Sequence, residues 1–171
     1  MKTNDNSDGV NVSLRHITKD SHEEVDANHM QGVMNISAEV TDPVHLSPEF
    51  PRIGSPDVLI KCVVSACAGN NHGFPKGDWI PYLGIYYQLT KNDSEWSSFG
   101  CLKPIISDPP QVIGEPAQRP FYGINTKLEG VGRYTLEFRV DPPAYHGLYR
   151  QTGTTSSWWS PFYETFEFYY N

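Results

Sequence analysis

Histidine and cysteine are the side chains of this chain best suited to metal binding or nucleophilic chemistry. The sequence has six histidines and three cysteines. His16, His22 and His29 lie in an acidic N-terminal stretch, where imidazoles among carboxylates could hold a divalent cation weakly, although they lack the tight spacing of a metal site. No Cys-x-x-Cys pair, nucleophile elbow, paired-acid or metal-hydrolase pattern is present. The sequence therefore favours a binding protein that is not an enzyme.

The cysteines limit the possible disulfides. Cys62 and Cys67 lie on one predicted strand at an odd separation, so their side chains face opposite sides and cannot bridge. Cys101 could pair with either of them, and the sequence leaves that choice open.

Length and charge bound the class of protein. The chain has 171 residues and a formal net charge of −7. A negatively charged protein repels the phosphate backbone, so we expect no nucleic-acid partner. It has no run of 18 apolar residues, so we expect no membrane insertion, and no signal peptide is visible at its start. We expect a polar, acidic and largely flexible tail over residues 1–30, with a short helix possible over 20–29, and one domain over 31–171.

Apolar and polar residues alternate in short runs separated by proline- and glycine-rich turns, which is typical of strands. The alternation predicts seven strands, at 33–41, 58–67, 82–91, 96–106, 121–128, 133–140 and 162–170. On the strand over 133–140 it predicts that Tyr134, Leu136, Phe138 and Val140 face inward. Pro104 is expected to break the fourth and to place it at an edge or a bulge. Without a predicted core helix, this pattern favours an all-β sandwich.

The segment 68–83 joins the second and third predicted strands, and its glycines, prolines and asparagines indicate a loop of specified geometry. On composition alone it is a well-packed hairpin connection. Its run Gly77-Asp78-Trp79-Ile80-Pro81-Tyr82-Leu83 also resembles a motif of the periplasmic iron-transport protein family. Further matches in the same order are Phe121-Tyr122-Gly123-Ile124-Asn125, Gly130-Val131-Gly132-Arg133-Tyr134 and Trp158-Trp159-Ser160-Pro161-Phe162.

The resemblance implies an immunoglobulin-like antiparallel β-sandwich of about seven to nine strands. It also implies a small metal-binding accessory protein of bacterial iron uptake, which is periplasmic or secreted, forms a homodimer and works beside a membrane permease.

This chain departs from the family pattern at the metal ligands. The family strand before the central loop carries His-x-acid-x-Asp-x-His, and the matching positions here are Leu59, Lys61, Val63 and Ser65. Other family ligand positions fall on Ile105, Phe121 and Gln151. The replacements remove lone pairs or anionic oxygens and add a cation, so they predict a degenerate pocket without cofactor or metal. His45 and Asp108 are the weak remaining candidates for metal ligands, and His72 and His146 have no partner that the sequence identifies.

Three functions follow. The first is a non-enzymatic binding protein whose former metal pocket could take a small anionic or aromatic ligand beside Lys61 and Phe121. The second is a working iron- or copper-binding accessory protein with rearranged ligands. The third is a secreted or surface β-sandwich that binds carbohydrate or protein through Trp96, Trp158 and Trp159, although core packing is the simpler role for Trp158 and Trp159.

Overall fold

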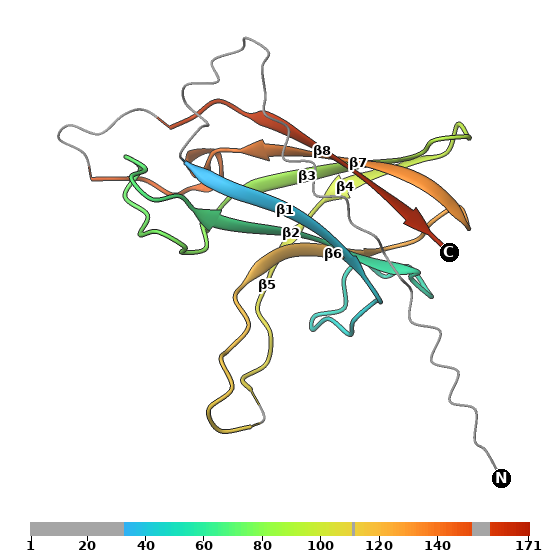
Figure 1. Cartoon of the computed structure of the whole chain (residues 1–171), viewed down its shortest axis with the longest axis horizontal. Helices are drawn as coiled ribbons and strands as arrows, with labels where there is room; N and C mark the ends of the chain where they lie inside the picture. Colours follow the sequence, from blue (N-terminus) through green and yellow to red (C-terminus); the bar gives the residue numbers. More distant parts are fainter. Residues whose placement is uncertain (1–32, 111, 152–157) are drawn as a thin grey trace.

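The computed structural model describes residues 33–110, 112–151 and 158–171, and these form two antiparallel sheets of four strands each. Sheet A has the order β1 (Met34–Thr41), β2 (Val58–Ala66), β6 (Phe121–Thr126) and β5 (Lys103–Ile105). Sheet B has the order β4 (Ser97–Cys101), β3 (Gly84–Lys91), β7 (Gly132–Asp141) and β8 (Phe162–Tyr170). A short 3-10 helix, η1 (Pro143–His146), follows β7. Figure 1 shows the two sheets as the two layers of a sandwich.

The order of the strands confirms the immunoglobulin-like sandwich. Strands 1, 2, 6 and 5 in one sheet and 4, 3, 7 and 8 in the other reproduce the two-sheet arrangement of immunoglobulin domains. The Tyr134 hydroxyl, near the start of β7, donates a hydrogen bond to the Gly130 carbonyl four residues upstream. This contact is the tyrosine corner of such sandwiches.

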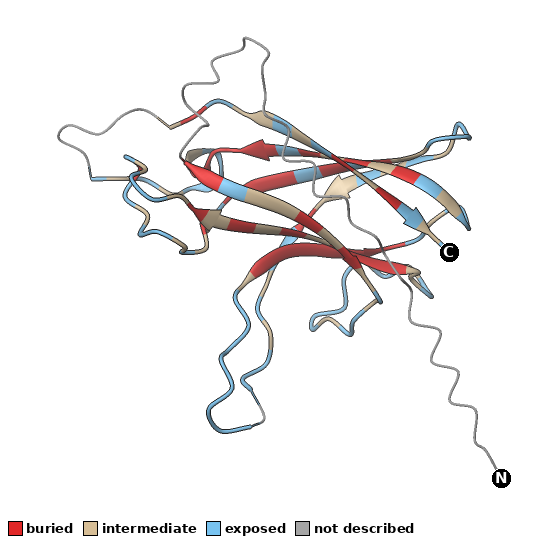
Figure 2. Ribbon diagram, in the orientation of Figure 1, coloured by how far each residue is buried: buried red, intermediate tan, exposed pale blue. Residues whose placement is uncertain are grey.

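The core lies between the inner faces of the two sheets, as the alternation predicts. Side chains alternate in and out along each strand, so every second residue reaches the core. On β7 the inward side chains of Tyr134, Leu136, Phe138 and Val140 are completely buried. Figure 2 shows buried segments along the strands, whereas most loops are exposed.

The predicted strand over 96–106 is in fact two strands in different sheets. β4 ends at Cys101 on the edge of sheet B, and β5 begins at Lys103 on the edge of sheet A. Leu102 sits between them, buried, and its N–H donates to the Ile85 carbonyl at 2.8 Å. The break therefore lies at Leu102, where the chain crosses between sheets. Pro104 lies in an edge strand, as predicted, where the missing N–H is tolerated.

The segment 68–83 is not a hairpin connection, because β2 belongs to sheet A and β3 to sheet B. Its geometry is specified as expected. Gly69, Gly73 and Gly77 have positive φ, and the Asn70 amide donates to the Cys67 and Phe74 carbonyls at 2.8 and 2.7 Å. The loop therefore carries the chain across the end of the sandwich in a defined conformation.

The sequence also led to expectations about the N-terminal tail, the disulfides and membrane insertion. The tail over 1–30 and the possible helix over 20–29 lie outside the described residues. Cys62, Cys67 and Cys101 are all free thiols, so neither disulfide left open by the sequence is formed. None of the described helical segments has the length and apolar character needed to cross a bilayer.

Candidate functional site

The predicted pocket residues of β2 share the outer face of sheet A, which points away from the sandwich core. Leu59, Lys61, Val63 and Ser65 alternate with the buried inward residues of this strand. The register places Lys61 between Glu39 on β1 and Gly123 on β6, and places Ile105 opposite Phe121. Six of the seven predicted pocket positions, all except Gln151, therefore come to one face.

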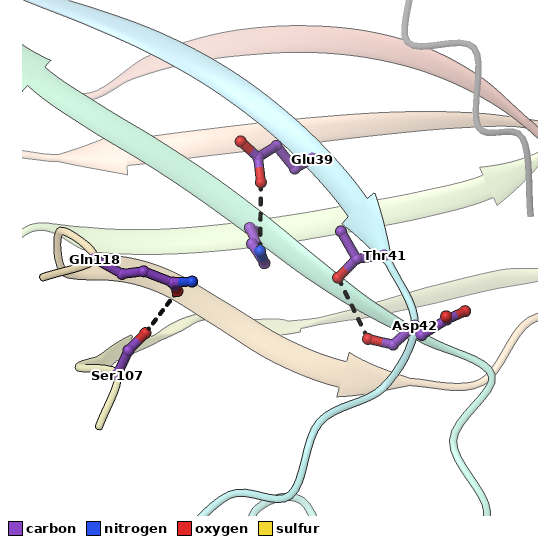
Figure 3. Close-up of polar contacts among 6 residues, drawn as sticks. Glu39, Thr41, Asp42, Ser107 and Gln118 are labelled. Carbon is purple, nitrogen blue, oxygen red and sulfur yellow. Dashed lines mark hydrogen bonds and ion pairs between the residues drawn. The ribbon is translucent and has the colours of Figure 1, made fainter. Parts of the chain in front are cut away.

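Lys61 is the charged centre of this face, and its ammonium already has two partners. Its Nζ lies 3.4 Å from Glu39 Oε2 and 5.1 Å from the centroid of the Phe121 ring. Figure 3 shows the Glu39 carboxylate turned toward β2, with a dashed line marking this ion pair. The side chain of Lys61 is only 22% exposed. Sequence reasoning missed Glu39, although its outward position on an alternating strand was the available signal.

Hydrocarbon fills the space beside the ammonium. A Cβ added at Gly123 would lie 3.0 Å from both Ile105 Cδ1 and Phe121 Cε2, so these two side chains lie directly over the glycine. Phe121 is buried on this outer face. Neither side chain carries a lone pair that could bind a cation.

The end of this face near Leu59 is closed by the loop over 42–57. Leu59 is completely buried, although it points away from the core between the sheets. Its neighbour across the strands is Asn125, whose Oδ1 accepts from the Val44 N–H at 3.2 Å and whose Nδ2 donates to the Val44 carbonyl at 2.7 Å. His45 follows directly and is exposed at the surface. Sequence reasoning did not single out Asn125.

The other two predicted positions, Asp108 and Gln151, lie in loops and not on the strands of sheet A. Asp108 is exposed in the long loop over 106–120, whose two arms are joined where Ser107 Oγ donates to Gln118 Oε1 at 2.9 Å (Figure 3). Gln151 is exposed and follows Arg150, whose described contacts lead to a different part of the fold.

Those contacts form an aromatic cluster. The Arg150 guanidinium lies 4.0 Å from the centroid of the Trp158 ring, and its Nη1 is 3.2 Å from His72 Nδ1. His72 is buried, stacks on Trp158 and meets Trp159 edge-on. His72 is thus part of the packing at this end of the sandwich. His146 instead lies over Gly84, where a Cβ would come within 2.0 Å of its Nε2.

The three tryptophans proposed as exposed stacking groups are packing residues. Trp159 belongs to the core, and Trp96 and Trp158 are half-buried against it. This result corrects the expectation that they form an exposed binding surface. Trp158 and Trp159 have the simpler packing role that the sequence also favoured.

Across residues 33–110, 112–151 and 158–171, no three or more His, Cys, Asp or Glu side chains are grouped as a metal site requires. The side chains of β2 on this face do not fit a transition-metal ion. They supply one hydroxyl and one positively charged ammonium, and the other two are apolar (Ser65, Lys61, Leu59 and Val63).

Comparison with known proteins identifies the relatives of this fold. The model of a family described as Fe2+ transport protein matches residues 21–171. The chain belongs to this iron-transport family. A UPF0423 protein of Brucella abortus is 32% identical over 148 residues, which are 81% of this chain and 76% of that protein. A 34 kDa membrane antigen of Treponema pallidum is 28% identical over 138 residues, covering 75% and 63% of the two chains.

Solved structures of iron-transport relatives include copper-bound proteins. A copper-bound variant of FetP from uropathogenic Escherichia coli strain F11 is 31% identical, with a TM-score of 0.72 over 81% of this chain and 90% of that one. FetP has also been recombinantly expressed in the periplasm. Copper-reconstituted P19 of Campylobacter jejuni is 28% identical, with a TM-score of 0.71 over 86% and 91% of the two chains. The family resemblance drawn from the sequence motifs is thus confirmed.

Proposed function

We propose that this protein is a non-enzymatic, periplasmic accessory protein of iron uptake in which a lysine ammonium has replaced the bound metal ion. The observation that supports this proposal most directly is the position of Lys61, whose Nζ is held between the Glu39 carboxylate and the Phe121 ring on the outer face of sheet A. In this proposal the tethered cation supplies permanently the positive charge that relatives obtain from a metal.

The electrostatics of the face support this assignment. A dication placed within a few ångströms of a half-buried ammonium is repelled strongly, because solvent screens the pair poorly there. Glu39 is already engaged by Lys61 and so is not available as an uncommitted ligand. The same ion pair argues against a small anionic ligand at this face, because most of the charge that would attract it is balanced.

Metal titration of the tag-free chain tests the proposal. Isothermal calorimetry with Cu2+, Zn2+ and Mn2+, and with Fe2+ under anaerobic conditions, should show no sub-micromolar binding. Lys61→Ala should not create such binding, because removing the cation adds no donor atom. Lys103→Ala, on the neighbouring edge strand, is the matched control. The double change Leu59→His with Lys61→Glu should restore affinity only in part, since Ile105, Phe121 and Gln151 still supply no strong ligand.

The second candidate is a working metal-binding accessory protein with rearranged ligands, drawing on His45, Asp108 or the histidines of residues 1–30. One observation favours this candidate. Asn125 hydrogen-bonds the backbone of Val44, and this places the next residue, His45, beside the outer face of sheet A that carries Lys61. Sub-micromolar binding that is lost in His45→Ala or Asp108→Ala would establish this candidate and overturn the first. Binding lost only when His16, His22 and His29 are replaced would assign the metal to the N-terminal stretch.

We infer also that the protein acts as a homodimer beside a membrane permease, as the family assignment suggests. Sedimentation velocity measures the dimer directly. Cell fractionation of the natural host, followed by cross-linking in the periplasm, tests location and partner together. A monomer recovered from the cytoplasm would contradict this part of the proposal.

A further inference from the structure

The outer face of sheet B carries a cross-strand row of aromatic and polar side chains. The register aligns Cys101, Tyr86, Arg139 and Tyr163 from β4, β3, β7 and β8 in one row. The adjacent row contains Phe99, Gln88, Glu137 and Thr165 in the same strand order. The intervening residues of each central strand point inward to the core, so these two rows form the outside of the sheet.

A shallow cavity of about 450 Å³ lies over these rows. We call it the aromatic groove, and its outward-facing lining includes Tyr86, Gln88, Phe99, Glu137, Arg139 and Tyr163. Its volume is within the range of small-molecule sites, about 300–1,000 Å³. Phe99 is 82% exposed and Tyr163 60% exposed, so both present ring surface to solvent. Tyr86, on β3 between them, is exposed as well, so three rings face solvent on the same side of sheet B.

The Arg139 side chain in the groove is held in place by two contacts. Arg139 Nε donates to Asp141 Oδ1 at 3.0 Å, and Asp141 is buried. The guanidinium also lies 5.8 Å from the centroid of the Tyr86 ring. The Arg139 side chain is nonetheless 45% exposed and lines the groove. Preorganised groups lose less freedom when a ligand binds.

We propose that the aromatic groove binds the chain of a neutral oligosaccharide. Sugar rings would stack on Phe99 and Tyr163, which stand at opposite ends of the groove on β4 and β8. Three strand spacings separate these strands, about 14 Å, which is the reach of a short oligosaccharide. Between the rings lie an amide, a carboxylate and a guanidinium, which together donate to and accept from sugar hydroxyls.

The chemistry of the groove disfavours other occupants. The net charge of −7 and the carboxylate of Glu137 repel a polyanion such as a nucleic acid. A peptide strand would need unpaired backbone groups to bind by strand addition, whereas β3 and β7 at the centre of this face pair on both sides. A neutral ligand with apolar ring faces and hydroxyl edges matches both kinds of side chain present.

This inference does not depend on the proposed function. The groove lies on sheet B, and the Lys61 face lies on the outer side of sheet A, across the sandwich core. Metal titration and sugar binding therefore succeed or fail separately.

A glycan array probed with the labelled full chain tests the proposal, followed by calorimetric titration with neutral cello-, malto-, xylo- and chito-oligosaccharides. We expect saturable binding to at least one neutral glycan. Phe99→Ala and Tyr163→Ala should each weaken that binding about tenfold, equivalent to about 1.4 kcal/mol, and together should abolish it. Tyr169→Ala is the matched control, because Tyr169 is an exposed tyrosine of β8 that does not line the groove.

Both ring variants replace exposed side chains, so they should keep the melting temperature of the parent, which calorimetry verifies. Absence of binding across the array overturns the proposal, as does binding that Phe99→Ala and Tyr163→Ala leave unchanged. Dissociation of a dimer by Phe99→Ala, with no sugar binding in the parent chain, would assign the groove to contact between two copies instead.

Discussion

Asn125 binds the backbone of Val44 at both its polar groups, with the Val44 N–H donating to Oδ1 at 3.2 Å and Nδ2 donating to the Val44 carbonyl at 2.7 Å. The two residues are 81 positions apart in sequence. One buried amide thereby holds the loop over 42–57 against β6, beside the face that carries Lys61.

We expect Asn125→Ala to lower the free energy of unfolding by about 1–3 kcal/mol, since it leaves both Val44 groups without this partner. Hydrogen exchange at the Val44 amide should become faster. Urea denaturation and exchange mass spectrometry measure the two effects. Asn92→Ala, which removes an exposed acceptor of the Thr135 hydroxyl, should cost clearly less. Equal losses in the two variants would contradict the clamp.

The ion pair of Lys61 and Glu39 should contribute little to stability, because exposed and half-exposed pairs are typically worth about 0–1 kcal/mol. Lys61→Met should therefore be close to neutral in urea denaturation, since a methionine side chain packs on Phe121 and Ile105. Glu39→Gln should be the more harmful change, because it leaves the ammonium without its carboxylate. A large loss in Lys61→Met, with Glu39→Gln unaffected, would contradict this assignment of the two roles.

Tyr122 should hold the segment over 79–83 through its hydroxyl, which donates to the Ile80 carbonyl at 2.7 Å and accepts from the Leu83 N–H at 3.1 Å. Tyr122→Phe removes both bonds within a buried site and should cost about 1–3 kcal/mol. Tyr169→Phe, which alters an exposed hydroxyl, should cost almost nothing. Chemical denaturation of both variants decides the matter, and similar stability in the two would refute the role of the Tyr122 hydroxyl.

Alkaline conditions should destabilise the fold. Burial raises the pKa of the Cys62 thiol above its ordinary 9.0, and burial likewise raises the pKa of Tyr122 and of Tyr134 above 10.0. The unfolded chain then releases protons that the folded chain retains, so stability is complete below about pH 9 and falls as the pH rises above it.

Each such group contributes a slope of about 1.4 kcal/mol per pH unit once its unfolded form has ionised. The free energy of unfolding of Cys62→Ala, measured by urea denaturation between pH 8 and 11, should fall less steeply with pH than that of the parent. The difference should be about the slope of one group. Parallel curves for the two proteins would show that the buried thiol does not contribute.

The period-two alternation on β7 was enough to predict both faces of this strand from the sequence. The inward residues Tyr134, Leu136, Phe138 and Val140 are buried as predicted, because alternation of side chains is a local property of an extended backbone. The same logic failed at 96–106, where the break was expected at Pro104 but the chain crosses between the sheets at Leu102. A strand that changes sheets keeps its local pattern, so nothing in the pattern marks the crossing.

For the candidate sites as well, some features could be predicted from the sequence and others depend on how the strands pair. The motifs of the chain identified its family, and they predict the positions where metal ligands are replaced. The partner of Lys61 was not accessible to that reasoning, because Glu39 and Lys61 meet only through the pairing of β1 with β2. The aromatic groove is formed by four strands from distant parts of the chain. The tryptophans that the sequence proposed as exposed stacking groups pack in or against the core instead.

The sequence by itself determined the β class, the inward and outward faces of a strand such as β7, and the family, since each depends on residue types and short spacings. Only the tertiary structure decided which residues share a face: the ammonium of Lys61 with Glu39 and Phe121 on sheet A, and the rings of Phe99 and Tyr163 on sheet B. The physical reason is that pairing between strands depends on the path of the whole chain and on the burial it achieves, which no local pattern specifies.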